Sequence, residues 1–328
     1  MSKLIANISV VGPEALDFGA FVKLQQEAFA EIISQTDTKY LFTESYYRWK
    51  YNSPVGSAKI ALVQDEGGLL AANSMYPLDI MAGGNCIRGW QSCDTATLPR
   101  GRGKGYFMKC ISTLTSELGQ DDIFFGFPNG NSLQGLIKSG WTHHSDVRTW
   151  MRILPICKNV GFSAIDPIEQ FSSEQDIFFF EYAAAKGGAI LDRGSVYMNW
   201  RYNQHPLHHY VIFGWRETGR LLGVVVLRRA KIVGRELAIV METLALSPRV
   251  ERGLLTFAAR WARDRHATYT VALNNTTHIT NGIMSGYVPI PMWALPKRQV
   301  LMGVACGARS QFAWNMPWHI QIGDWDVF

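Results

Sequence analysis

A basic, glycine-rich segment in the first half of the chain is the pattern that most directly predicts chemistry. It reads Arg100-Gly-Arg102-Gly103-Lys104-Gly105-Tyr106-Phe107 and lies between a predicted strand, 87–98, and a predicted amphipathic helix, 108–118. Glycines let backbone N–H groups face outward, and the first N–H groups of a helix have no partner within it and favour an anion. The segment therefore predicts a phosphate-binding corner, although it has neither the Walker pattern nor the dinucleotide pattern GxGxxG. An ordinary turn with a solvated basic face is the alternative.

A second polar segment follows at a short distance. A predicted apolar strand, 123–127, leads to Pro128-Asn129-Gly-Asn131-Ser132, then to a predicted helix, 133–139, and to Gly140-Trp141. Asparagine and serine are common at helix N-caps. A capping role for Asn131 or Ser132 is therefore the alternative to ligand binding.

These two segments, in this order, resemble the GNAT acyltransferases. In that family the motif Arg/Gln-x-x-Gly-x-Gly/Ala binds the pyrophosphate of coenzyme A through main-chain N–H groups. Aligned on Pro99, the motif begins at Arg102, its first glycine is Gly105, and Phe107 departs from its last position. A literal match, Arg100-x-x-Gly103-x-Gly105, lies two residues earlier. We prefer the Pro99 alignment because it places the glycines at the start of the helix.

The resemblance implies that acetyl-CoA or another acyl-CoA is the cosubstrate. It assigns to cofactor binding Thr97, Leu98, Arg102, Gly103, Lys104, Gly105, Tyr106, Phe107, Asn129 and Asn131. It covers most of the chain, strongly over 90–141 and at the C-terminal tail.

Acyl transfer to an amine needs a hydrogen-bond donor for the developing oxyanion and a group that takes the proton of the amine. The resemblance implies a backbone N–H of Thr97 or Leu98 as the donor. For the proton, Asp94 is the first candidate, because it lies on the strand just before the loop, and Asp326 and Asp324 in the tail come next.

The general acid is a second open question. The tyrosine that usually serves as general acid in this family falls at Leu136, so Tyr106 or solvent would protonate the leaving thiolate. His143 and His144 titrate in a useful range, but they follow the Gly140-Trp141 turn and are expected at the surface.

The chain also repeats itself. Trp49-Lys-Tyr51-Asn52 returns as Trp200-Arg201-Tyr202-Asn203, 151 residues later. Each copy is followed by a predicted hairpin, a proline-initiated helix and a Ser-Gly-aromatic sequence in the same order. We therefore predict an α/β fold with mixed sheets and two tandem GNAT-like domains, 1–157 and 158–328. Two unrelated α/β domains are the alternative.

The second copy lacks the phosphate loop. Its equivalent reads Ser247-Pro-Arg249-Val-Glu251-Arg252-Gly253, with one glycine and an acidic residue. We expect it not to bind CoA but to form a wall of the acceptor site. The candidate acceptor-binding residues are Trp200, Arg201, Tyr202 and Asp324. Core packing is the alternative for the first three.

Composition narrows the function classes. The 328 residues are 47% hydrophobic and 18% charged, as in a packed protein, and the net charge of +5 is too scattered for a nucleic-acid surface. The five cysteines have no metal-binding spacing, so we expect reduced thiols, no metal and a cytoplasmic location. The sequence shows neither a signal peptide nor an apolar run of about 18 residues.

A narrower resemblance concerns the acceptor. The segment 126–132 and the tail 318–328 resemble bacterial tandem GNAT proteins of surface-polysaccharide synthesis, which acylate the amine of nucleotide-linked amino sugars. Two alternatives stay open: a FemX-like transferase that uses aminoacyl-tRNA, and a non-catalytic protein that binds acyl-CoA or a nucleotide sugar.

Overall fold

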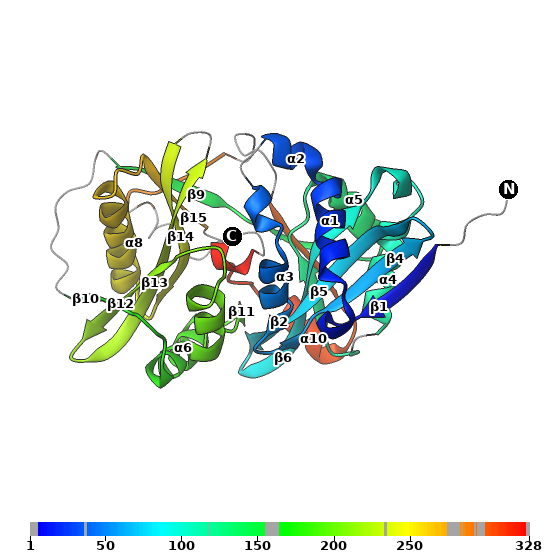
Figure 1. The fold of residues 1–328 in the computed structure, drawn as a ribbon. Coiled ribbons are helices and arrows are strands. Elements are labelled where there is room, and N and C mark those ends of the chain that lie inside the picture. The colour runs from blue at the N-terminus through cyan, green and yellow to red at the C-terminus, as the bar shows by residue number, and fades with distance from the viewer. Residues whose placement is uncertain are drawn as a thin grey trace.

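The strands form two mixed sheets that lie on either side of the C-terminal segment (Figure 1). The structure is a computed structural model and describes residues 6–35, 38–117, 119–154, 164–232, 235–273, 283, 285–291, 293 and 299–325. In spatial order the first sheet contains β1 (Asn7–Val11), β4 (Lys59–Asp65), β5 (Gly68–Ala82), β6 (Asn85–Thr97), β7 (Ile123–Gly126), β17 (Val300–Ala305) and β8 (Thr142–Asp146). The second contains β10 (Ile165–Pro167), β12 (Val211–Glu217), β13 (Arg220–Ile232), β14 (Arg235–Ala245), β15 (Tyr269–Leu273), β9 (Thr149–Ile153) and β16 (Val288–Pro289). The short strand β11 (Ala189–Leu191) pairs with β5, and β2 (Asn52–Ser53) pairs with β3 (Gly56–Ser57).

The helices pack on these sheets through their apolar faces. They are α1 (Phe18–Ala28), α2 (Ala30–Gln35), α3 (Glu44–Lys50), α4 (Tyr106–Ser116), α5 (Gly130–Lys138), α6 (Ser173–Lys186), α7 (Ser195–Met198), α8 (Pro248–Arg263) and α10 (Ala308–Trp314). In α4 the buried side chains of Cys110, Ile111 and Leu114 share one face and pack on the first sheet, as helical periodicity requires. In α8, Val250, Leu254 and Ala258 pack on the second sheet in the same way. None of the helices in the described ranges has the length and apolar content that a membrane crossing requires.

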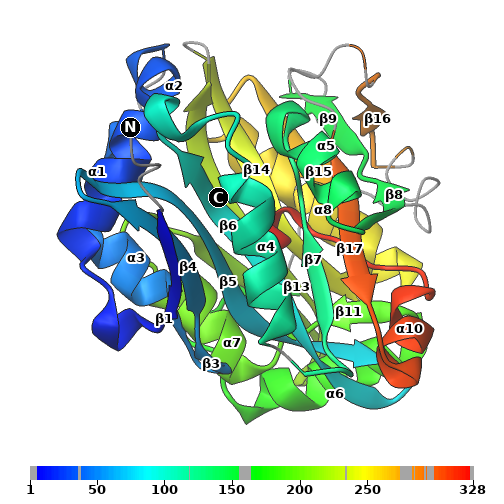
Figure 2. The same ribbon diagram turned by 90° about the vertical axis from the view of Figure 1, so that its right-hand side faces the viewer.

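Each half gives its last strand to the other half. β17, from the end of the chain, lies between β7 and β8 of the first sheet and is antiparallel to both (Figure 2). Reciprocally, β9 lies between β15 and β16 of the second sheet and is antiparallel to both. The exchange joins the two halves through backbone hydrogen bonds. The division at residue 157 stays a prediction, and a cut there would remove β17 and β11 from the first sheet and β9 from the second.

The duplicated organisation is visible in the strand registers. β6 and β7 pair in parallel from Gly89↔Ile123, and β14 and β15 pair in parallel from Leu237↔Tyr269. In both halves the long central hairpin precedes this pair, as β5–β6 and β13–β14. The predicted α/β class with mixed sheets and two tandem halves is confirmed.

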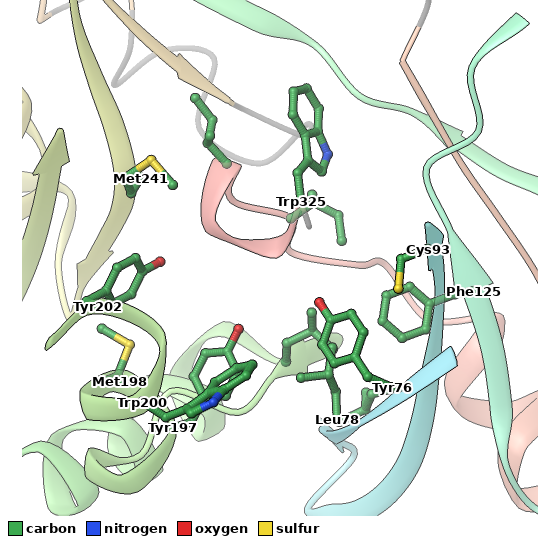
Figure 3. Packing of buried hydrophobic residues seen from close by; sticks show 14 of the residues in the cluster. Tyr76, Leu78, Cys93, Phe125, Tyr197, Met198, Trp200, Tyr202, Met241 and Trp325 are labelled. Carbon is green, nitrogen blue, oxygen red and sulfur yellow. The ribbon is translucent and has the colours of Figure 1, made fainter. Parts of the chain in front are cut away.

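The largest hydrophobic cluster lies between the two halves. It joins residues of β5, β6 and β7 to residues of α7 and β14 and to the C-terminal residues Trp318–Trp325 (Figure 3). The tail enters this cluster by pairing with β11, because Ala189 N donates to Pro317 O at 2.8 Å and His319 N donates to Ala189 O at 2.9 Å. The interface between the halves is thus built around the tail.

Candidate active site

The glycine-rich segment forms an open corner at the start of α4. A short turn, Pro99–Gly101, follows β6, and then Gly103 and Gly105 both adopt φ of 75°, a conformation that other residues rarely take. Gly105 is the N-cap of α4, and no side chain among the described residues caps the helix there. The N–H groups of the first turn of α4 therefore have neither intrahelical nor capping partners. This is the geometry that an anion needs.

The two arginines of the loop have different roles. Arg100 Nη1 binds both carboxylate oxygens of Asp65, at 2.9 and 2.6 Å, and the hydrogen bond with Arg100 holds the pKa of that carboxyl below its usual value. Arg102 is exposed, and no ion pair of its side chain is found within the described part of the chain. Arg100 thus anchors the loop to the β4–β5 turn, and the contact of Arg102 with a ligand stays a prediction.

Phe107, the residue that departs from the GNAT motif, packs between α4 and α5. A Cβ on Gly135 would lie 2.2 Å from Phe107 Cε1, so the aromatic ring occupies the space that the glycine leaves. Tyr106, Phe107 and Leu133 pack against the cluster beneath α4. A large residue at this position is accommodated because α5 carries glycine opposite it.

The pairing between β6 and β7 ends below the loop, and we call the unpaired interval between these two strands the slot. The two strands are paired only from Gly89↔Ile123 to Gln91↔Phe125, after which β6 runs on to Thr97 while β7 ends at Gly126. Leu98 N donates to Leu70 O at 2.9 Å, so its N–H is engaged with β5. Because successive N–H groups of a strand point to opposite sides, Thr97 directs its own towards the slot. The oxyanion-donor role of Thr97 or Leu98 stays a prediction, and the contact of Leu98 N with Leu70 O makes Thr97 the better candidate.

Asn129 caps α5. Its Oδ1 accepts from Asn131 N at 2.9 Å and from Ser132 N at 3.1 Å, and Ser132 Oγ accepts from Asn129 N at 3.1 Å. The N-cap is thus Asn129 rather than Asn131, Ser132 completes a capping box with it, and α5 begins at Gly130. Asn131 lies exposed in the first turn of the helix. Contacts of Asn129 and Asn131 with a cofactor stay a prediction.

Asp94 lies on a β-bulge that interrupts β6. The pairing with β5 shifts between Ala72 and Ser74, and Asp94 has φ of 48°. Simple alternation along the strand therefore does not decide which way its carboxylate faces. Lys50 Nζ lies 2.8 Å and the Tyr51 hydroxyl 2.9 Å from the same oxygen, Oδ2. The Asp94 side chain is largely buried, and both of these contacts fall on this one oxygen.

Tyr51 keeps its proton at neutral pH. Burial, followed by the charge of Asp94, raises the pKa of this hydroxyl well above its usual value. Its oxygen also lies 2.7 Å from Ser74 Oγ. The hydroxyl therefore serves as a fixed donor to the carboxylate of Asp94.

The second half contains an equivalent carboxylate in a different setting. Glu242 lies next to the bulge of β14, which falls at Met241, and the hydroxyl of Tyr202, the counterpart of Tyr51, donates to it. Arg193 Nε lies 3.0 Å from Glu242 Oε2, and the other side of this guanidinium binds the tail residue Asp324. Burial raises the pKa of Glu242 to about 6, although the charge of Arg193 opposes the shift. The three charges are inaccessible to solvent.

The predicted acceptor residues are part of this interior. Trp200, Arg201, Tyr202 and Asp324 are all buried, and Arg201 donates to the carbonyl oxygens of Gly323 and Trp325, each at 3.1 Å. Their burial agrees with the core-packing alternative. Their contact with an acceptor stays a prediction.

In the second half the tail contacts β14 beyond the point where the pairing of β14 with β15 ends. Gln321 Oε1 accepts from Thr243 N at 3.3 Å, and Gln321 Nε2 donates to Thr243 O at 3.4 Å. Thr243 stands three residues before Leu246, as Thr95 stands before Leu98. The side-chain amide of Gln321 thus pairs with the backbone of the residue that corresponds to Thr95 in the first half.

The start of α8 is closed as well. Ser247 caps the helix by accepting from Val250 N at 3.3 Å, Pro248 stands at its first position, and Glu251 adds a negative charge in the first turn. A helix start with a cap and a carboxylate does not favour a phosphate. These contacts agree with the prediction that the second half binds no CoA.

The remaining candidates lie away from the slot or outside the description. Leu136 is buried beneath α5. His143 and His144 are on β8, which β17 separates from β7. His143 contacts Asp146 and is exposed, whereas His144 is half-buried beside Trp314, and burial lowers its pKa. Asp326 lies outside the described residues.

The fold of this chain is similar to that of several solved structures. No protein-family model matches this chain, and no curated protein matches it. Among solved structures it is similar to a probable N-acyltransferase from Enterococcus faecalis V583, with 12% identity, a TM-score of 0.65 and 94% of this chain and 74% of that chain covered. A GCN5-related N-acetyltransferase from Anabaena variabilis is similar at 12% identity and TM-score 0.65, over 92% of this chain and 73% of that one. An N-myristoyltransferase from Saccharomyces cerevisiae with bound myristoyl-CoA is similar at 10% identity and TM-score 0.62, over 94% and 85%. At such identities the likeness shows a shared fold.

Proposed function

We propose that this protein transfers an acyl group from acyl-CoA to a primary amine. The observation that carries the proposal is that β6 continues beyond its pairing with β7 and leads directly into the glycine loop and the uncapped start of α4. A phosphorylated ligand with a long, amide-bearing arm fits both parts: the N–H groups of the loop bind its phosphates, and the strand edge of β6 binds its arm. Solved acyltransferases of the same fold, one of them with myristoyl-CoA bound, support this choice of ligand.

The residues around the slot supply what the reaction needs. Thr97 N–H donates to the oxyanion that forms when the amine attacks the thioester carbonyl. Asp94 Oδ1 takes the proton that the amine loses, while Tyr51 and Lys50 hold Oδ2 in place. The C–S bond then breaks, and the sulfur leaves as a thiolate that solvent or Tyr106 protonates.

For the acceptor we propose the amino group of a nucleotide-linked amino sugar. The support is the resemblance of segments 126–132 and 318–328 to enzymes of surface-polysaccharide synthesis. An amine that reaches Asp94 must approach the face of the first sheet covered by α1 and α3, because Gln25 of α1 donates to Asp94 O at 2.7 Å and Lys50 ends α3. The acceptor site therefore lies on the side of the sheet that faces the second half.

The test is a turnover assay with acetyl-CoA and a matched acceptor panel. The panel contains nucleotide-linked amino sugars, the corresponding free amino sugars, and lysine-containing peptides. We expect thiol release and a mass increase of one acyl group for the nucleotide-linked amines, at a higher kcat/KM than for the free sugars. CoA binding without turnover on any amine would contradict the enzyme and favour a sensor. Turnover only on peptides would contradict the acceptor class.

A further inference from the structure

The C-terminal tail lies across the closed end of the slot in the first half. Gln91 is the last residue of β6 that pairs with β7, and its side chain is buried. Gln91 Nε2 donates to the backbone oxygen of Asp324 at 2.8 Å, and Gln91 Oε1 accepts from the Tyr76 hydroxyl at 2.7 Å. The tail is therefore fixed at the point where the two strands diverge.

Trp325 is the next residue of the tail, and its ring lies against the first half. The centroid of its indole is 6.1 Å from that of Phe127, the residue that directly follows β7, and the side chain of Trp325 is almost completely buried. In Figure 3, Trp325 lies between Met241 and Tyr202 on one side and Cys93 and Phe125 on the other. Arg201 Nη2 donates to the backbone oxygen of Trp325 at 3.1 Å, so the position of the ring is held from the second half.

The side chains at the closed end share one face of the sheet. Cys93 follows Gln91 by two residues on β6, and Phe127 follows Phe125 by two residues along the chain from β7, so all four are expected on the same face. Cys93, Phe125 and Trp325 belong to the cluster between the halves, whereas Trp90 and Phe124 belong to the cluster beneath α4. An acyl chain that runs from the loop between the unpaired parts of β6 and β7 therefore reaches Trp325 and Phe127 on this face of the sheet.

We propose that Trp325, together with Phe127, forms the end wall of the acyl slot and restricts the acyl group to acetyl or propionyl. This inference rests on the proposed function. A thioester whose phosphates occupy the loop has its carbonyl near Thr97 N–H, and its acyl carbons continue towards the end where Gln91 and Asp324 are bonded. Each added methylene would have to displace a packed indole, and overpacking of such a site is unfavourable. The second half, through the tail, therefore selects the group that the first half transfers.

The test compares acetyl-, butyryl-, hexanoyl- and octanoyl-CoA with the full-length wild type and with Trp325→Ala. Two quantities are measured: kcat/KM with a saturating amine, and the dissociation constant without acceptor by calorimetry. We expect the wild type to favour acetyl-CoA over hexanoyl-CoA by about 10-fold or more in both. Trp325→Ala should raise the hexanoyl-to-acetyl ratio by about 10-fold or more, because the removed ring leaves room for the longer chain.

Trp261→Ala is the matched control. Trp261 is as buried as Trp325 but lies on α8 in the separate cluster of the second half. It should lower stability without changing the acyl preference. If Trp325→Ala does not fold, Trp325→Phe and Phe127→Leu provide smaller cavities, and each should shift the preference towards butyryl-CoA.

An active wild type that uses octanoyl-CoA as well as acetyl-CoA would overturn the inference and leave the proposed function intact. The same holds for folded Trp325 variants with an unchanged chain-length ratio. A wild type that binds none of the four thioesters would overturn the proposed function and this inference with it.

Discussion

Trp49 and Trp200 bind each other reciprocally across the interface between the halves. Each indole N–H donates to the backbone oxygen of the other residue, at 3.1 and 3.4 Å, and the rings are stacked with centroids 4.7 Å apart. Two equivalent residues that exchange the same contact lie about a local two-fold axis, as in a symmetric dimer. The repeat in the sequence is thus a pair of domains that pack through their repeated motif.

The first prediction concerns the arginine of the loop. Arg102→Ala should weaken CoA binding by about 1.5–3 kcal/mol, the usual value of a hydrogen bond to a charged group. Gly105→Val should weaken it further, because valine is strained at φ of 75°. Calorimetry with CoA measures both. Arg100→Ala is the control, since Arg100 already binds Asp65. A larger loss for Arg100→Ala than for Arg102→Ala would favour the earlier alignment of the motif.

The second prediction concerns stoichiometry. Calorimetry should find one CoA per chain, because Gln321 occupies the backbone of Thr243 and Ser247 caps α8. Two equivalent sites would contradict the structural reading of the second half.

The loop and the order of the elements could be predicted from sequence because their signals are local. Glycines at a strand-to-helix junction, Pro99 after the strand and the asparagines before α5 each act on adjacent residues. The exchange of β9 and β17 could not be predicted, because either strand satisfies its apolar pattern in either sheet. The contact of Gln321 with Thr243 depends on a register between segments 78 residues apart. The bulge at Asp94 could not be predicted either. Aspartate can adopt a positive φ, so no glycine stands in the sequence to indicate the bulge.

The third prediction tests how tightly the tail is packed. A Cβ on Gly323 would lie 2.0 Å from the Tyr202 hydroxyl and 2.3 Å from Glu242 Oε1. Gly323→Ala should therefore lower the free energy of unfolding by about 1–3 kcal/mol. Gly130→Ala is the control, because nothing lies within 4 Å of its added methyl group. Equal denaturation midpoints for the two variants would show that the tail is loosely held.

The fourth prediction concerns pH and the buried carboxylate Glu242. Its pKa is about 6 in the folded protein against an ordinary value of 4.5, so protonation favours the folded state. The stabilisation is complete below pH 4.5 and is lost as the pH rises through 6, by about 2 kcal/mol for a shift of this size. The free energy of unfolding of Glu242→Gln should not show this decrease as the pH rises.

The readout is the difference between the wild type and Glu242→Gln in urea denaturation at several pH values from 4.5 to 7. The wild-type curve alone is insufficient, because burial lowers the pKa of His205 to about 2 and acid therefore also destabilises the fold. Parallel curves for the two proteins would show that Glu242 does not titrate in this range.

The last prediction concerns Asp94 as the proton acceptor. Asp94→Asn keeps the shape of the side chain and removes its basicity, so turnover at neutral pH should fall by about 10²-fold or more, while CoA affinity changes little. The rate should partly recover at higher pH, where the amine is already neutral. Because Lys50 loses an ion pair at 2.8 Å, the folded fraction is checked by circular dichroism. Asp122→Asn is the control: this carboxylate accepts from Trp90 Nε1 and lies away from the slot face. Wild-type turnover with an unaltered pH profile in Asp94→Asn would exclude Asp94. The proton would then have to pass to water or to a carboxylate of the tail, and since Asp324 is engaged by Arg193 in the interior, water would be the acceptor among the described groups.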